Sequence, residues 1–158
     1  MQVKTKTMGT VEVGEERLIS IPSGLFGFEE YTDFALVDCE YEPLIWLQSL
    51  QDPNLAFLLI DPFLITDEYE ADIADSELMR IGIKDPADVT VMTIVTVPGD
   101  GSPVTANFQG PLIINKKNHL CMQAILEGSR WTTKHNIIEA LKRKKCGSYW
   151  TATGSYDA

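Results

Sequence analysis

The alternation of hydrophobic and polar side chains predicts that most of the chain forms short β-strands. Residues 89–97 give the clearest signal, because they are rich in β-branched side chains and place alternate residues from Val91 to Val97 on one face. The run 55–60 is apolar at every position, which is typical of a strand buried on both faces. Other short apolar runs, each closed by a turn signal, lie at residues 11–13, 18–21, 34–37, 45–50, 104–109, 112–115 and 120–126.

Turn signals separate these runs about every 8–12 residues, a spacing typical of all-β barrels and sandwiches. Asp52-Pro53-Asn54 is a strong one, because proline presets φ at the second position of a turn and aspartate favours the first. It predicts that 45–50 and 55–60 form a hairpin. The pattern therefore predicts a mainly β fold: a small antiparallel β-barrel-like or sandwich domain with short helices, including one near the C-terminus.

Residues 23–30 contain two glycines, Gly24 and Gly27, that bracket apolar side chains. Such glycines favour a tight loop of the backbone. We expect Leu25, Phe26 and Phe28 of this loop to plug one end of the core.

Two segments have a helical pattern. Asp75 or Ser76 is a suitable N-cap for a short helix that carries Leu78, Met79 and Ile81. Residues 133–145 place isoleucines and a leucine on one stripe and gather cations at the C-terminal end, where the helix dipole favours them. We therefore expect a β-barrel-like domain over 1–131, a basic amphipathic helix over 132–146 packed on or next to it, and a flexible tail over 147–158.

The length of 158 residues predicts one domain. The longest apolar run has six residues and a spanning helix needs about 20, so we expect no contact with a membrane. The first residues lack the apolar stretch of a secretory signal, which favours a cytoplasmic location. Three widely spaced cysteines, Cys39, Cys121 and Cys146, are interpreted as reduced thiols, in agreement with that compartment.

Charge divides the chain into two unequal parts. Residues 1–110 carry 20 acidic and 5 basic side chains, a net charge of −15, whereas residues 111–158 carry 3 and 8, a net charge of +5. An acidic body is repelled by phosphate, so we expect no direct binding of nucleic acid. The acidic excess either keeps the protein soluble or attracts a basic partner.

The sequence offers no constellation for catalysis. His119 and His135 are sixteen residues apart without a metal-binding motif, and no nucleophile or nucleotide-binding motif is present. We therefore expect no enzyme, no cofactor and no metal site. The densest carboxylate cluster leaves three interpretations open, a solvated face, a surface for a basic partner, or a metal or acid–base site: Asp67, Glu68, Glu70 and Asp72.

One long stretch of the sequence resembles a known protein family. Residues 46–63, W-L-Q-S-L-Q-D-P-N-L-A-F-L-L-I-D-P-F, resemble the FliW flagellar assembly factor family. Three further segments agree in the same order, and the likeness extends from about residue 2 to residue 135: residues 24–29, 105–115 and 123–126.

The resemblance implies a small β-barrel-like fold and a non-enzymatic cytoplasmic protein with two partners. One is CsrA, an RNA-binding translational repressor, and the other is flagellin. In the scheme that the family implies, secretion of flagellin frees the factor to capture CsrA, which lifts the repression of flagellin translation. Free flagellin in the cytoplasm then displaces CsrA.

The acidic body agrees with this role, because RNA-binding regulators are basic and opposite charges steer encounter. We predict a CsrA-binding surface with Asn54 beside the acidic cluster, made of Asn54, Phe63, Asp67, Glu68, Glu70 and Asp72. The flagellin-binding groove cannot be located in the sequence. We expect a monomer when free. The alternative is a dedicated flagellin chaperone without CsrA regulation, whose binding would respond less to salt.

Overall fold

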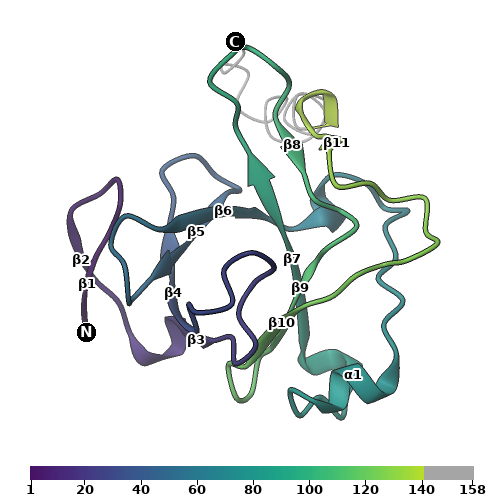
Figure 1. Cartoon of the computed structure of the whole chain (residues 1–158), viewed down its shortest axis with the longest axis horizontal. Helices are drawn as coiled ribbons and strands as arrows, with labels where there is room; N and C mark the ends of the chain where they lie inside the picture. Colours follow the sequence, from purple (N-terminus) through teal and green to yellow (C-terminus); the bar gives the residue numbers. More distant parts are fainter. Residues whose placement is uncertain (141–158) are drawn as a thin grey trace, which may run out of the picture.

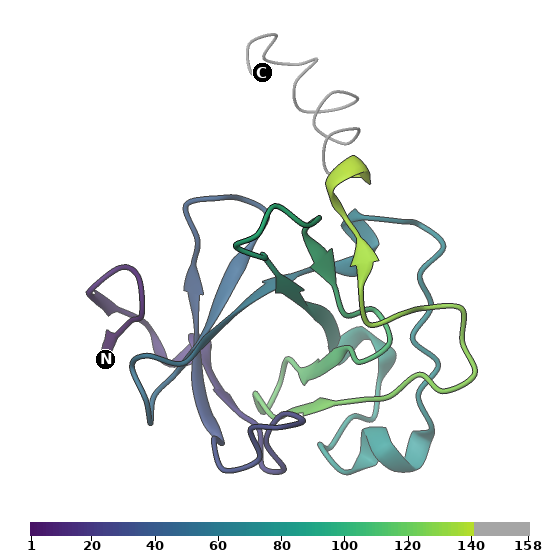
Figure 2. The same cartoon turned by 45° about the horizontal axis from the view of Figure 1, so that its top comes forward.

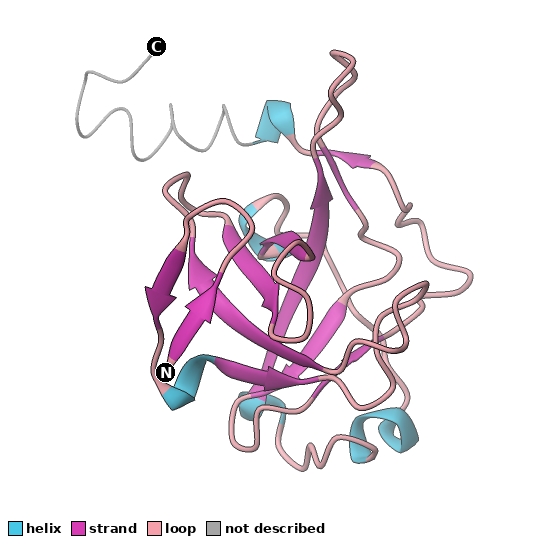
Figure 3. Ribbon diagram, turned by 60° about the vertical axis from the view of Figure 1, so that its left-hand side comes forward, coloured by secondary structure: helices cyan, strands magenta, loops and turns pink. Residues whose placement is uncertain are grey.

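The computed structural model describes residues 1–140, and strands predominate over short helical turns (Figures 1 and 3). The helical elements with bounds inside residues 1–140 are α1 (Asp75–Met79) and the 3₁₀ turns η1 (Glu15–Arg17), η2 (Pro62–Leu64) and η3 (Pro86–Asp88), and a further helix begins at residue 138. The strands in this part of the chain are β1 (Gln2–Lys4), β2 (Thr10–Glu12), β3 (Leu18–Ser20), β4 (Asp33–Asp38), β5 (Ile45–Ser49), β6 (Ala56–Ile60), β7 (Val89–Thr96), β8 (Thr105–Ala106), β9 (Leu112–Asn115), β10 (Cys121–Gln123) and β11 (His135–Asn136).

Apart from the β1–β2 pair, the strands join one antiparallel sheet in the order β10-β9-β7-β6-β5-β4-β3. The long strand β7 changes partners along its length, because its first half pairs with β9 and its second half with β6 and β8. Strand β11 extends the sheet beyond β8. The mainly β, antiparallel fold predicted from the sequence is confirmed.

The sheet curls until its two ends meet, which gives it a barrel-like shape without full closure (Figure 2). A single parallel bridge joins Ser20 of β3 to Leu120, just before β10. Its backbone hydrogen bond runs from the Ser20 N–H to the His119 carbonyl at 3.0 Å. The seam between β3 and β10 is therefore held at one point.

Apolar side chains pack on both faces of the sheet, as the continuous run 55–60 predicted. Leu59 of β6 belongs to the core inside the curl, together with Phe34 and Leu47. Its neighbour Ile60 belongs to a second core on the other face. The side chains of Leu59 and Ile60 are fully buried.

The loop at residues 23–30 fills the end of the barrel less completely than the sequence suggested. Leu25 is buried in the core, but Phe26 is 53% exposed and Phe28 is 36% exposed. Gly24 adopts a positive φ of 69°, which allows the tight turn of the loop, and the half-exposed ring of Phe28 packs edge to face on Phe57 with 5.1 Å between centroids. The prediction was wrong for Phe26.

The predicted helix near the C-terminus begins later than its pattern indicated. Residues 133–134 form a turn, and β11 pairs with β8 before helical structure starts at residue 138. Asn136 Oδ1 accepts a hydrogen bond from the Ile138 N–H at 3.0 Å, and Ile137 is fully buried in the core. Burial of Ile137 favours the extended chain over another helical turn. The rest of that helix and the tail over 147–158 lie outside the described residues.

The two cysteines in the described part of the chain, Cys39 and Cys121, are buried free thiols. Burial raises the pKa of the Cys121 thiol to about 12. None of the helices in residues 1–140 combines the length and the apolar character that crossing a bilayer demands.

Candidate functional site

The acidic cluster lies on an extended segment that alternates between the core and the surface. Tyr69 is buried, and Ala71 and Ile73 pack against the same core. The residues that alternate with these three, Glu68, Glu70 and Asp72, are exposed. The period of two that buries one set of residues therefore lines up the other set as a row of carboxylates.

Tyr69 holds this segment in place. Its hydroxyl donates to the Phe108 carbonyl at 2.9 Å, and its ring lies 5.1 Å from Phe108 and 5.0 Å from Trp131 between ring centroids. Burial raises the pKa of the Tyr69 phenol well above its usual range, so the group stays a neutral donor. The acidic row is therefore attached to a rigid aromatic cluster.

The loop 126–131 forms the opposite wall of a surface groove of about 640 Å³, lined also by Glu68, Glu70 and Asp72. Gly128, with a positive φ of 70°, allows the tight turn of this loop. Ser129 stabilises the turn because its hydroxyl donates to the Leu126 carbonyl at 2.9 Å. We call this feature the acidic groove.

The residues that line the acidic groove, all in the described part of the chain, include four carboxylates and one guanidinium. Arg130 lies 2.6 Å from a Glu68 carboxylate oxygen and 4.5 Å above the Trp131 ring. Both charged side chains of this pair are more than half exposed, so the ion pair contributes at most about 1 kcal/mol to stability. The groove keeps a net negative charge.

His135 also belongs to the aromatic cluster next to the groove. Its ring stacks on Phe108 with 4.4 Å between centroids and lies 5.9 Å from Trp131. Burial and, secondarily, the positive charge of Arg130 hold the pKa of His135 below its ordinary value. A neutral imidazole is therefore favoured beside the carboxylates.

The structure brings together most of the predicted surface. Phe63 is 43% exposed on η2, and its ring meets Tyr69 edge to face at 5.6 Å. Asp67 is exposed in the turn just before the groove. Glu68, Glu70 and Asp72 line the groove itself.

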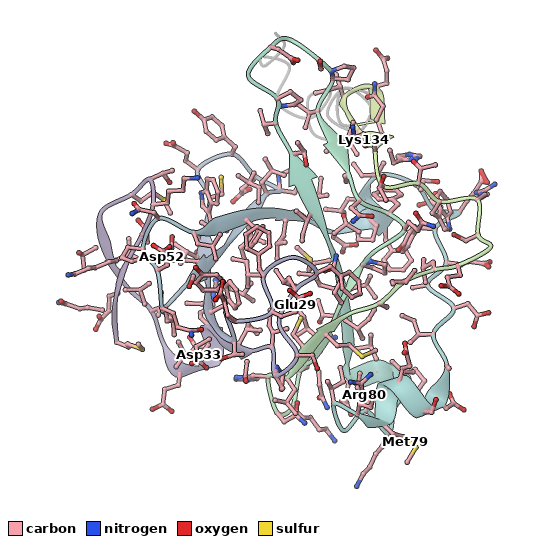
Figure 4. All side chains as sticks on the ribbon, in the orientation of Figure 1. Glu29, Asp33, Asp52, Met79, Arg80 and Lys134 are labelled. Atoms are coloured by element: carbon pink, nitrogen blue, oxygen red, sulfur yellow. The ribbon has the colours of Figure 1, made fainter. Side chains whose placement is uncertain are left out.

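Asn54 was wrongly placed beside the acidic cluster. It is exposed in the turn that precedes β6, whereas Phe63 follows that strand. Five residues of extended strand separate the two ends by roughly 17 Å. Asp52 of the same turn lies far to the left in Figure 4, away from Arg80 and Lys134.

Sequence reasoning missed the second wall of the groove. This wall is a loop that contains Glu127, Arg130 and Trp131. Its Arg130 contacts Glu68, although 62 positions separate the two residues in the sequence. The glycine and serine at 128–129 indicate a turn, but no local pattern says which segment that turn faces. Within the described residues, no group of three or more histidine, cysteine or carboxylate side chains is arranged to hold a metal ion.

The fold and the acidic groove define a small antiparallel β-protein with an exposed, negatively charged surface site. Residues 2–137 match the model of the family described as FliW protein. The chain is 51% identical to the flagellar assembly factor FliW of Treponema denticola over 141 residues, which cover 89% of this chain and 96% of that protein. It is 49% identical to the protein of the same name from Treponema pallidum, over 92% of this chain and 97% of that protein.

A solved structure gives the same result. The chain is similar to a protein described as the flagellar assembly factor FliW, with a TM-score of 0.79 and 36% identity over 87% of this chain and 96% of that one. This chain belongs to the FliW family of flagellar assembly factors.

Proposed function

We propose that this flagellar assembly factor binds the translational repressor CsrA through the acidic groove and thereby antagonises repression of flagellin translation. Flagellin is the second partner, and its binding displaces CsrA. In this role the protein acts in the cytoplasm, as a monomer when free, and needs neither a cofactor nor a catalytic group.

The row of three carboxylates on one wall of the groove carries this proposal. Glu68, Glu70 and Asp72 are held outward because Tyr69, Ala71 and Ile73 are fixed in the core. A partner rich in lysine and arginine finds these charges already oriented, so little side-chain ordering is left to oppose binding. Exposed Phe63 supplies an apolar contact at the edge of the same surface.

Charge reversal tests the surface directly. In the double variant Glu70→Lys/Asp72→Lys we expect the affinity for purified CsrA to fall at least about tenfold, since like charges would face the basic partner. The matched control is Glu30→Lys/Glu40→Lys, which makes the same change in net charge at exposed positions outside the groove. Equal affinities of the two variants would show that the groove is not the CsrA surface.

A dedicated flagellin chaperone is the competing function. The row of carboxylates favours the CsrA function because it attracts a basic partner. The two functions differ in their response to salt: a charge-steered complex weakens as the salt concentration rises, whereas apolar docking of flagellin does not. Flagellin binding without any binding of CsrA would support the chaperone.

A further inference from the structure

The seam between β3 and β10 leaves part of a sheet edge without a partner. Ser20 and Leu120 are bridged in parallel, so continued pairing would bring the N–H of residue 22 to the Cys121 carbonyl. Residue 22 is proline, which has no N–H. The next residues turn away, and the Gly24 N–H donates to the Ile21 carbonyl at 2.8 Å.

The edge that remains continues beyond the end of β10. Towards β9, Met122 pairs with Ile113, the Ala124 N–H donates to Pro111 at 2.9 Å and the Leu126 N–H donates to Gln109 at 2.8 Å. In an antiparallel ladder alternate residues bond to the same neighbour. The backbone groups of Gln123 and Ile125 therefore point to the seam, and no hydrogen bond pairs them with the described part of the chain.

A groove of about 660 Å³ runs along this edge, and all five residues from 121 to 125 line it. Residues of both faces of the strand touch the groove, as expected when the strand presents its edge. We call it the seam groove. The loop that carries Phe26 forms its far side and is held there because the Phe26 N–H donates to Gln123 Oε1 at 3.0 Å.

The lining of the seam groove combines apolar and acidic side chains. Phe26 and Ile125 are each 53% exposed and both line this groove. Three carboxylates and one guanidinium also line it, from the loop 23–30, from α1 with its C-cap and from the loop 126–131: Glu29, Glu77, Arg80 and Glu127. Figure 4 shows Glu29 on the loop and Arg80 beside α1. The net charge of the lining favours a cationic ligand.

We propose that this edge binds an extended segment of a protein partner that carries alternating apolar and basic side chains. The segment adds to the sheet as a further strand beside β10. Its backbone pairs with Gln123 and Ile125, its apolar side chains contact Phe26 and Ile125, and its cations meet Glu29, Glu77 and Glu127. Main-chain pairing gives affinity and the alternate side chains give selectivity. The seam groove adjoins the acidic groove and shares Glu127 with it, but this proposal does not rest on CsrA binding there.

A fluorescent seven-residue peptide of alternating valine and lysine is the probe. We expect it to bind the full chain, while a valine–glutamate peptide does not. Two copies carry N-methyl groups in the two possible registers, one on the odd and one on the even residues, so that each keeps its charge but cannot pair along one of its edges. The copy whose methyl groups face β10 should bind about tenfold more weakly, as the loss of one or two hydrogen bonds predicts.

Ile125→Pro removes the backbone donor from the protein side and should weaken the parent peptide by about tenfold. Ile125→Ala keeps that N–H and is the control for the lost side chain. The N-methyl comparison uses the unaltered chain, so it tests backbone pairing at this edge even if Ile125→Pro fails to fold. Equal binding of the parent and both N-methyl registers, or no binding of the parent, overturns the proposal.

Two other occupants would show themselves in the same experiments. A dimer in sedimentation that Ile125→Pro dissolves would assign the edge to a second copy of this chain. Tighter binding of a peptide with the sequence of residues 141–158, which contains four consecutive basic residues at 142–145, would assign it to the chain's own C-terminal segment. Either result overturns binding of a separate partner.

Discussion

At the scale of single residues, Tyr69 anchors the acidic segment to the aromatic core. Its ring contacts Phe63, Phe108 and Trp131, and its hydroxyl satisfies the Phe108 carbonyl. The residue lies between two exposed carboxylates, so its burial decides where they point. The surface proposed to bind CsrA is thus oriented by a buried aromatic side chain.

Tyr69→Phe should keep the packing but leave the buried Phe108 carbonyl without its donor. We expect the free energy of unfolding in urea to fall by about 1–2 kcal/mol. Tyr41→Phe, at a side chain that is 68% exposed, is the control and should change it by less than about 0.5 kcal/mol. A Tyr69→Phe protein as stable as the parent would mean that this hydrogen bond contributes nothing.

His135 should make stability depend on pH. Because its pKa is lowered in the folded state, the unfolded chain takes up a proton first as the pH falls below about 6.5. Stability is therefore complete above that pH and declines as the pH falls through the folded pKa. His135→Gln should flatten the decline in urea midpoints between about pH 7 and pH 5.

Thr133→Gln is the control for that titration, because it places the same amide side chain at an exposed position in the turn before β11 and removes no titratable group. It should leave the pH profile of the parent unchanged. The interpretation of His135 would be wrong if both variants kept the same profile.

At the scale of elements, Gln48 is a buried polar residue within a run that the sequence pattern presents as apolar. It lies in β5 and is 1% exposed. Its amide nitrogen donates to the carbonyls of Pro53 and Leu55, both at 3.1 Å, and its oxygen accepts from the Lys6 N–H at 2.9 Å. One side chain therefore fastens both the hairpin turn and the N-terminal strands.

Gln48→Leu should be destabilising although it adds a hydrophobic residue to a strand. It leaves two carbonyls and one N–H without this partner, and we expect a loss of about 2 kcal/mol or more in the free energy of unfolding. Gln2→Leu, at an exposed position of β1, is the control. A stabilised Gln48→Leu protein would contradict the role of this network.

Strands with a clear period could be predicted from the sequence, and elements defined by distant contacts could not. The β-branched run of β7 and the hairpin of β5 and β6 follow local rules of propensity and turn geometry. Strand β11 has only two residues, so its sequence carries no period, and a helical stripe was assigned to it instead. It is defined by pairing with β8 and by burial of Ile137.

The same limit applies to the acidic groove. The local density of carboxylates at 67–72 pointed to one wall, because Glu68, Glu70 and Asp72 follow one another along a single segment of the chain. The other wall depends on which loop the fold brings opposite, and Asn54 was misplaced because neighbours in sequence were assumed to be neighbours in space. A strand of five residues between them is enough to separate them.

At the scale of the whole molecule, negative charge is in excess, and carboxylates outnumber the single arginine in the lining of each groove. A negative surface raises the rate of encounter with a cationic protein. We expect the association rate with CsrA to fall several-fold between low and physiological salt, while the dissociation rate changes less. Stopped-flow measurements at several salt concentrations check this. An association rate independent of salt would remove charge steering from the mechanism.

The most direct test of the partner switch is calorimetric titration of this protein with purified CsrA, alone and with saturating flagellin. We predict binding in the absence of flagellin, with loss of that binding when flagellin is present. CsrA that fails to bind, or that binds equally in both titrations, would contradict the switch.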